Sequence, residues 1–331
     1  NLIRKKAAVA RWVPLLVPLL FFIAATPFTP ESAAQSRTIA ITDEASDTPE
    51  AVVTDTPEIT PAEVPTDTPT PETTPEETAT PTPTETPTPE PTKEAGEMKV
   101  HFLDVGQGDG IYLCTSAGVS LMIDGGSSDT KNVGTYRILP FLKSKAVRKV
   151  SYWFVSHTDE DHISGIAEVL ESGYRVEHLV LAKAQKKDEK AIRLAEIARQ
   201  NGTAVCYMKA GERLHCGSDE STEVVKCLYP AENEAAADVN DRCLVLYYQG
   251  QNFRGFFGGD ISSEVEEKIV SENSLLKVDF LKASHHGSKY ANSDALLQVL
   301  RPSLSVASAG ENNRYGHPSR DAIARIRDHG S

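Results

Sequence analysis

Residues 150–165 read VSYWFVSHTDEDHISG, and this stretch decides how the rest of the chain is interpreted. Its first part, 150–155, is rich in aromatic and β-branched residues, which is typical of a buried strand. The polar segment HTDEDH at 157–162 follows directly and places two His and two Asp in one turn. A solvated turn that caps the next helix is the alternative, but it accounts for only one aspartate. Because imidazole nitrogen and carboxylate oxygen are ligands of divalent cations, we predict a metal site here.

Other strands expected from the sequence also end in residues that can carry chemistry. An aspartate at such a place can simply cap the following helix, whereas two adjacent histidines are uncommon without a ligand role. A glycine-rich turn, DVGQGD at 104–109, is weaker evidence by itself, because such turns form without any function. In chain order the residues at strand ends are Asp124, Asp260 and the pair His285-His286.

Short strands and helices alternate over residues 99–327, and this order predicts an α/β fold. Two strand-rich halves, each followed by helices, indicate a four-layer αββα sandwich, although the strand order stays open. We expect strands at 99–105, 111–115, 119–123, 150–155, 177–181, 224–228, 244–248, 253–257, 278–281 and 304–307. We expect helices at 134–146, 163–170, 187–200, 262–270, 293–300 and 320–327.

The formal net charge of −13 comes almost entirely from one segment of the 331 residues. Residues 43–98 carry 15 acidic side chains, one lysine and 12 of the 20 prolines, whereas the remaining residues after 98 are close to neutral. Such a segment buries little apolar surface, so we predict a disordered Thr/Pro/Glu-rich spacer over 35–97. The acidity therefore describes a tether and says little about the partner of the folded part.

The first 34 residues have the order of a secretory signal. Basic residues precede a 14-residue apolar run at 12–25, and small residues follow at 32–34. The run is shorter than the ~20 residues of a membrane-spanning helix. We therefore expect a signal peptide over 1–34, with a retained N-terminal anchor as the alternative, and a protein that is extracellular, either secreted or held at the cell surface.

The motifs together resemble the metallo-β-lactamase superfamily, and within it the C-terminal hydrolase domain of ComEC competence proteins. The resemblance covers about residues 98–331 and does not extend to the first 97 residues. Asp159 stands where the superfamily usually has a second histidine, and Asn240-Asp241 stands where a further histidine is common. The family domain also continues with closing strands beyond the last expected helix. The matching stretches are FLDVGQGD at 102–109, IDGG at 123–126, SHTDEDHISG at 156–165, GD at 259–260, HHGS at 285–288 and YGHP at 315–318.

The resemblance implies a hydrolase that holds two divalent ions, Zn or Mn, and activates water between them. One ion would take His157 and Asp159, and the other would take Asp161, His162 and one of His285 and His286, with Asp260 bridging. The residues closest to the reaction would be Asp161, His162 and Asp260. Substrate phosphate could be held by Ser288, Lys289 and His317, or by Lys282 and Arg314, and the supporting residues would be Asp104, Asp109 and Asp124.

Three functions are compatible with this pattern. A phosphodiesterase or nuclease comes first, because an Asp-rich two-metal arrangement and the ComEC resemblance both favour a phosphodiester substrate such as DNA. A cell-wall teichoic-acid phosphodiesterase, similar to choline-phosphate esterases, is the second, because the spacer would set the domain into the wall or at the membrane. A non-catalytic binding module on the same fold is the third. No feature of the sequence indicates an obligate protein partner.

Overall fold

The computed structural model describes residues 97–217, 221–234 and 238–331, and the strands of this part pair into two six-stranded sheets. The expected signal segment at 1–34 and nearly all of the expected spacer at 35–97 lie outside the described residues. No helix in the described ranges is long and apolar enough to cross a bilayer.

The first sheet has the order β1-β2-β3-β4-β5-β6. Strands β1 to β3 are antiparallel, and β3 to β6 are parallel, since helices connect β4 to β5 and β5 to β6. The strands are β1 (Lys99–Phe102), β2 (Ile111–Cys114), β3 (Ser120–Ile123), β4 (Val150–Phe154), β5 (Val176–Ala182) and β6 (Ala204–Met208). The helices of this half are η1 (Gly134–Ile138), α1 (Leu139–Ser144), α2 (Glu160–Glu171), η2 (Lys183–Gln185) and α3 (Glu189–Gln200).

The second sheet repeats this plan, with the order β12-β11-β10-β9-β8-β7. Here β7 to β10 are antiparallel, and β10 to β12 are parallel. The strands are β7 (Arg213–His215), β8 (Val224–Tyr229), β9 (Val245–Gln249), β10 (Arg254–Phe257), β11 (Phe280–Lys282) and β12 (Leu304–Val306). The helices are η3 (Asn240–Arg242), α4 (Ser263–Glu272), η4 (Ser284–Gly287), α5 (Asp294–Leu300) and α6 (Arg320–Asp328).

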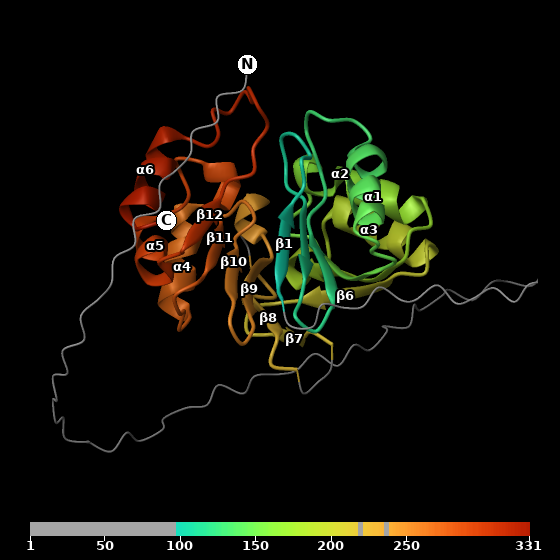
Figure 1. The fold of residues 1–331 in the computed structure, drawn as a ribbon, viewed down its shortest axis with the longest axis horizontal. Helices are drawn as coiled ribbons and strands as arrows, with labels where there is room; N and C mark the ends of the chain where they lie inside the picture. The colour runs from blue at the N-terminus through green and yellow to red at the C-terminus, as the bar shows by residue number, and fades with distance from the viewer. Residues whose placement is uncertain (1–96, 218–220, 235–237) are drawn as a thin grey trace, which may run out of the picture. The chain divides into compact units, whose positions relative to one another are not determined.

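The two sheets face each other, with α1 to α3 outside one and α4 to α6 outside the other (Figure 1). Alternation along the strands produces this arrangement, because successive side chains point to opposite faces of a sheet. In β9, Leu246 and Tyr248 pack between the sheets, whereas Val245 and Tyr247 pack under the outer helices. The predicted four-layer αββα sandwich is confirmed.

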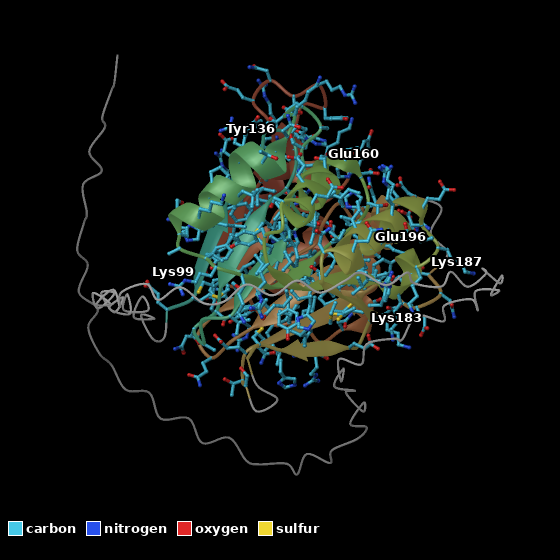
Figure 2. All side chains as sticks on the ribbon, turned by 90° about the vertical axis from the view of Figure 1, so that its right-hand side faces the viewer. Lys99, Tyr136, Glu160, Lys183, Lys187 and Glu196 are labelled. Atoms are coloured by element: carbon cyan, nitrogen blue, oxygen red, sulfur yellow. The ribbon has the colours of Figure 1, made fainter. Side chains whose placement is uncertain are left out.

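Helix α3 shows why the outer layers form where they do. Its buried residues Ala191, Leu194, Ala195 and Ala198 recur at helical spacing and face the sheet. The opposite face is charged, and Glu196 points outward there, as Glu160 does at the start of α2 (Figure 2). The helix begins at Glu189, two residues later than expected, because the Asp188 side chain accepts a hydrogen bond from the Ala191 amide and caps it.

Two strands have no counterpart among the expected elements, namely β6 and β7. Both are edge strands of their sheets, and β7 has only three residues. Because edge strands bury less apolar surface than central strands, their sequences carry a weak periodic signal.

Candidate metal centre

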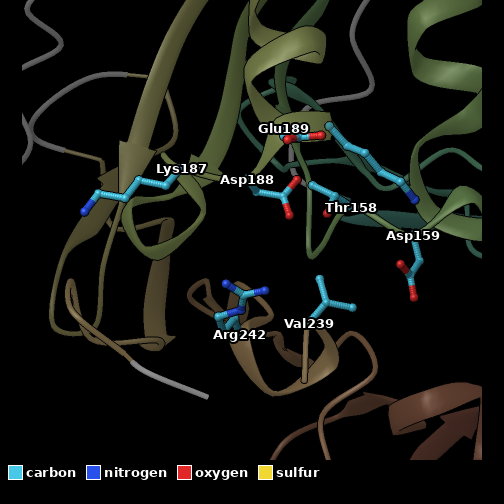
Figure 3. A pocket seen from close by; sticks show the side chains of 8 residues that line it. Thr158, Asp159, Lys187, Asp188, Glu189, Val239 and Arg242 are labelled. Atoms are coloured by element: carbon cyan, nitrogen blue, oxygen red, sulfur yellow. The ribbon is translucent and has the colours of Figure 1, made fainter. Parts of the chain in front are cut away.

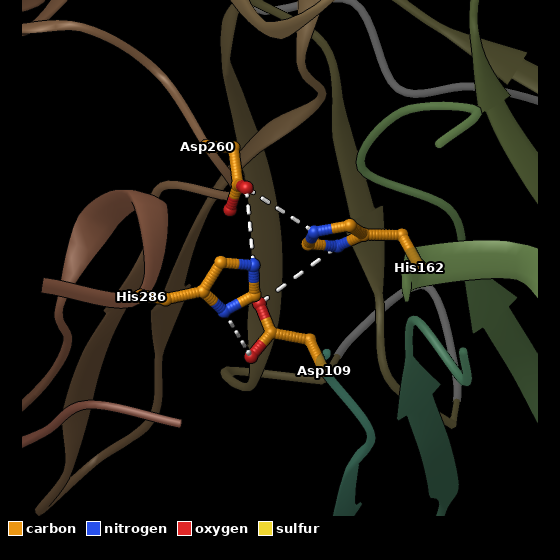
Figure 4. A group of neighbouring side chains, drawn as sticks. All are labelled: Asp109, His162, Asp260 and His286. Atoms are coloured by element: carbon orange, nitrogen blue, oxygen red, sulfur yellow. Dashed lines mark ion pairs between the residues drawn. The ribbon is translucent and has the colours of Figure 1, made fainter. Parts of the chain in front are cut away.

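Four buried side chains from distant parts of the chain meet where the two sheets present strand ends. They are Asp109 before β2, His162 in the first turn of α2, Asp260 after β10 and His286 in η4 after β11. One ligand-type atom from each lies within 4.8 Å of the others, and Figure 4 shows the four side chains converging. In α/β sheets, ligands bind at the carboxyl ends of parallel strands, and three of these residues follow such ends.

His162 is oriented by Asp124, the residue that ends β3. Its Nδ1 lies 2.9 Å from Asp124 Oδ2, and the same carboxylate accepts hydrogen bonds from the Ser156 amide and hydroxyl, both at 2.7 Å. A carboxylate can only accept, so Nδ1 carries the hydrogen and Nε2 is turned toward Asp260 Oδ2, 3.4 Å away. This is the arrangement in which an outer carboxylate fixes a metal-binding imidazole. Asp124 therefore holds His162 and Ser156, which lie in the loop after β4 at 156–162 (the metal loop).

His286 is held in the same way from the other half of the molecule. Its Nδ1 lies 2.8 Å from the Ser308 carbonyl oxygen, which leaves Nε2 facing Asp260 Oδ2 at 3.1 Å and Asp161 Oδ2 at 3.5 Å. The neighbouring His285 is farther away, with its Nε2 at 3.9 Å from Asp260 Oδ2 and its side chain 32% exposed. The sequence left open which of the pair faces the cluster, and the structure places His286 there.

The backbone at this pair is strained in a way that serves the site. His285 and His286 both have positive φ angles, 49° and 52°. Residues other than glycine pay of order 1–3 kcal/mol each for such a conformation, which persists only when the surroundings impose it. Hydrogen bonds from the His285 amide to Gly259 O and from the Ser288 amide to His285 O impose it here.

Asp260 reaches the cluster through a turn that requires glycine. Gly259 has φ of +61°, and a Cβ at this position would lie 2.9 Å from Ser156 Cβ and 3.0 Å from Cys243 Sγ. The Asp260 amide points to Cys243 Sγ at 3.3 Å, so the carboxylate is turned toward the two histidines. The close approach of the 258–260 turn to the end of β4 therefore brings the two sheets' residues together.

Lys282 at the end of β11 is buried inside the same site. Its Nζ lies 2.5 Å from Asp109 Oδ2 and 3.5 Å from Asp260 Oδ1, and it donates a hydrogen bond to Gly259 O at 3.2 Å. Lysine is almost never fully buried unless it is paired. Burial would lower the pKa of Lys282, but the two carboxylates outweigh burial and raise it.

The electrostatics of the cluster are dominated by its carboxylates. Burial would lower the pKa of His286, but the charges of Asp260 and Asp109 raise it to about 9. Burial would raise the pKa of Asp161, yet the interaction with His286, whose Nε2 lies 3.5 Å away, and the charge of His162 lower it to about 2. The pKa of His157, by contrast, is lowered well below its usual value by burial and by His162. The site therefore concentrates negative charge that favours a cation.

Several buried side-chain atoms of the cluster have no hydrogen-bond partner among the described residues. Whether these atoms could coordinate a metal ion depends on their number and kind. Buried polar atoms are normally paired, so a group of unpaired acceptors at one point indicates a missing ligand. Apart from ion pairs with one another and with Lys282, the atoms without a hydrogen-bond partner are both carboxylate oxygens of Asp109, Oδ1 of Asp260, and the Nε2 atoms of His157, His162 and His286. Nitrogen and oxygen donors in this number and burial fit a divalent ion.

His157, Asp159 and Asp161 extend the cluster along the loop after β4. The His157 side chain is buried, its Nδ1 lies 3.1 Å from Ser156 Oγ, and its Nε2 lies 3.7 Å from Asp159 Oδ2. The Asp159 side chain is 44% exposed, whereas that of Asp161 is 19% exposed. The expected ligands of the loop thus lie together, with Asp159 at the solvent side.

No protein-family model matches the chain, but curated relatives do. ComE operon protein 3 of Bacillus subtilis is 30% identical over 251 residues, which are 71% of this chain and 31% of that protein. Recombination protein 2 of Haemophilus influenzae is 26% identical and matched over 69% of this chain and 26% of its own length. Competence protein ComA of Neisseria gonorrhoeae is 28% identical, with 71% and 30% matched. This chain is a ComEC-like member of the metallo-β-lactamase superfamily. It spans a third or less of the length of each of these relatives.

Solved structures with a similar arrangement are distant in sequence from this ComEC-like chain. The metallo-β-lactamase fold protein YhfI of Bacillus subtilis is 13% identical, with a TM-score of 0.39 and coverage of 56% of this chain and 71% of YhfI. A diphosphatase of the PhnP family is 14% identical, with a TM-score of 0.35 and coverage of 60% and 71%.

The residues expected to hold substrate phosphate or to support the ligands lie in different places in the ComEC-like domain. Ser288 is buried, and its Oγ accepts from the Tyr290 amide at 3.3 Å. Lys289 is exposed, with Nζ 4.8 Å from the Tyr290 ring centroid. His317 is half-buried beside the two histidines. Asp104 has a side chain that is 83% exposed and is paired with Arg137 at 3.5 Å.

A cavity of about 470 Å³ opens beside the metal loop. Thr158 and Asp159 form one wall, and Arg242 of η3 and Asp188 face each other across it (Figure 3). Arg242 Nε is buried without a hydrogen-bond partner in the described part of the chain. The cavity therefore gives a polar ligand access to the solvent side of the loop.

The resemblance implied a supporting role for Asp109, whereas the structure places it within the four-residue cluster. The sequence signal for Asp109 as a ligand was weak, because a glycine-rich turn between two strands can form without any function. For Lys282, the resemblance implied only a contact to substrate phosphate. A lysine that ends an apolar strand must, however, be either exposed or paired. Its partners come from two other segments and could not be inferred from its own neighbours.

Proposed function

We propose that this chain is a metal-dependent phosphodiesterase of the nuclease type. The observation that carries the proposal is the set of unpaired, buried His and Asp atoms that converge at the ends of strands from both sheets. The competence and recombination names of its relatives support DNA as the substrate. The basic residues and apolar run at 1–34 support export, so we place the activity outside the cell.

We propose that Asp109, His162, Asp260 and His286 hold a divalent ion, with Asp161 beside them. Zn²⁺ and Mn²⁺ both accept such a mixed nitrogen and oxygen donor set. His157 and Asp159 would take part in a second ion's coordination. Divalent ions bound there would lower the pKa of a water molecule and polarise a phosphoryl oxygen.

The chain's own residues then set up the reaction geometry. Asp124 and the Ser308 carbonyl keep the Nε2 atoms of His162 and His286 aimed into the cluster. Lys282 neutralises part of the charge of Asp109 and Asp260, which lets two carboxylates share a small buried space. Asp159, at the solvent side, lies where the substrate would enter from the cavity.

The test is cleavage of defined polymers by purified protein loaded with Mn²⁺ or Zn²⁺. We expect single- or double-stranded DNA to be cleaved, and Asp161→Ala to lower the rate at least about 100-fold. Asp104→Ala is the matched control: although the resemblance implied a supporting role for it, this aspartate is 83% exposed and paired with Arg137, so its removal should leave the rate unchanged.

Teichoic acid and RNA are the other substrates of this test. Intact DNA with cleaved teichoic acid would replace the nuclease by a cell-wall phosphodiesterase. Protein that binds no metal and cleaves none of the polymers would leave only a binding role for the fold.

A further inference from the structure

A loop at 310–318 lies next to the metal centre and is rigidly built. The Asn313 side chain accepts hydrogen bonds from the amides of Tyr315 (3.1 Å) and His317 (3.0 Å) and donates to the carbonyls of Gly310 (2.9 Å) and His317 (2.6 Å). The Gly310 amide in turn donates to Gln107 Oε1 at 3.0 Å. The position of the loop relative to the centre is therefore fixed by hydrogen bonds at several points.

Rings on this loop connect the surface to the metal centre. Tyr315 is 49% exposed, and its ring lies nearly parallel to that of His317, with centroids 5.7 Å apart and planes at 24°. His317 is in turn nearly parallel to His286, at 6.3 Å and 27°. Because His286 belongs to the cluster, Tyr315 presents an exposed aromatic surface only two rings away from the proposed ligands.

A positive charge accompanies this exposed ring. The Arg314 guanidinium carbon lies 4.9 Å from the Tyr315 ring centroid, and its Nη2 donates to the Tyr315 hydroxyl at 2.7 Å. Arg314 is itself exposed. An aromatic ring with an arginine beside it can bind a nucleobase by stacking and an adjacent phosphate by charge.

We propose that Tyr315 and Arg314 bind a nucleobase and its phosphate in a single-stranded nucleic acid whose scissile phosphodiester lies at the metal centre. This inference rests on the proposed function and adds how the substrate is recognised. A single strand is favoured over a duplex, because bases in a duplex are already stacked on one another. Teichoic acid has no aromatic base, so it could not use the Tyr315 ring in this way.

Binding without cleavage tests the proposal directly. The full chain in EDTA is titrated into a fluorescein-labelled oligothymidylate and into an abasic deoxyribose-phosphate oligomer of the same length, with anisotropy as the readout. We expect wild type to prefer the oligothymidylate, and Tyr315→Ala to weaken its binding about 5- to 150-fold while the preference over the abasic oligomer disappears. Tyr315→Phe should keep the preference.

Two further variants separate stacking from a general loss of structure. Tyr136→Ala removes another exposed tyrosine, which is 68% exposed on η1 (Figure 2), and should bind both oligomers as wild type does. Arg314→Ala should reduce the slope of log affinity against log salt by about one, since one phosphate contact is lost. Equal affinity of wild type for the two oligomers, or Tyr315→Ala binding like wild type, would overturn the proposal.

The proposed function is read out separately with the abasic oligomer. Wild type with Mn²⁺ should cleave it, because the metal centre acts on the phosphodiester and not on the base. Cleavage without a preference for bases would leave the phosphodiesterase standing and remove the base site. A preference for the base-containing oligomer without cleavage of either oligomer would keep the base site and remove the phosphodiesterase.

Discussion

Two buried carboxylate sites lie near opposite ends of β2, and they differ in how their oxygens are satisfied. Glu223, beyond the far end, accepts hydrogen bonds from the amides of Ser116 (2.9 Å) and Ala117 (3.0 Å) and from the Tyr248 hydroxyl (2.9 Å). Among the described residues, Asp109, before the near end, faces only ionisable groups: the Lys282 ammonium at 2.5 Å from Oδ2, and the Nδ1 atoms of His162 and His286, each 3.8 Å from a carboxylate oxygen.

The difference separates a structural carboxylate from one that is held ready for a ligand. At Glu223, neutral donors from a turn of one sheet and a strand of the other tie the two sheets together, and the hydrogen bonds lower the pKa of Glu223 despite its burial. At Asp109 and Asp260, the surrounding groups are two histidines and one lysine, whose side chains are positively charged when protonated. Burial alone therefore does not identify a functional carboxylate, whereas burial among ionisable side chains, without neutral donors, favours a cation site.

Removing Asp260 should have the largest effect. In Asp260→Asn, the cluster loses the carboxylate that faces both His162 and His286, so we expect metal binding to fall below detection and hydrolysis to drop at least about 100-fold. Metal content after gel filtration, measured by mass spectrometry, checks the first expectation. Wild type should also melt at a higher temperature when metal is added, because a ligand that binds only the folded state stabilises it, and the variant should not respond. A variant that still retains metal would show that Asp260 is not a ligand.

Asp124→Asn should weaken metal binding without abolishing it. The amide can no longer serve as a charged acceptor for both Ser156 and His162, so the imidazole loses its fixed orientation. Outer-shell changes of this kind typically cost 10- to 100-fold in metal affinity, and calorimetric titration with Zn²⁺ or Mn²⁺ measures it. Unchanged affinity would mean that packing alone orients His162.

Glu223→Gln should act on stability and leave the metal centre intact. The amide cannot accept from all of its present donors, so we expect the free energy of unfolding to fall by about 1–3 kcal/mol, as measured by denaturant unfolding. Metal affinity should stay within twofold of wild type. A large loss of metal affinity would show that the two ends of the sheets are coupled.

The stabilisation by Glu223 should itself depend on pH, and this is the smallest expected effect. The folded-state pKa of Glu223 is lowered from a usual value of 4.5, so its contribution is present above pH 4.5 and is lost as pH falls through the folded value. The difference in unfolding free energy between wild type and Glu223→Gln should therefore shrink in acid. A constant difference down to pH 3 would contradict this cause.

The sequence alone predicts the fold class, the strand ends that carry chemistry and most of the residues that meet there. It could do so because alternation places side chains on one sheet face or the other, and because HTDEDH at 157–162 and the pair His285-His286 concentrate ligand types in a few residues. Local patterns of this kind report on what a segment contains and which way it faces.

Which residues share the centre depends on how the two sheets pack against each other. Asp109 precedes β2 of the first sheet and Lys282 ends β11 of the second, far away in sequence, so their 2.5 Å ion pair exists only once the sheets pack face to face. The choice of His286 over His285 depends on positive φ angles imposed by Gly259 and on the Ser308 carbonyl. Edge strands β6 and β7 likewise pair with only one neighbour each and are mostly half-buried, so the periodic signal in their sequences is weak.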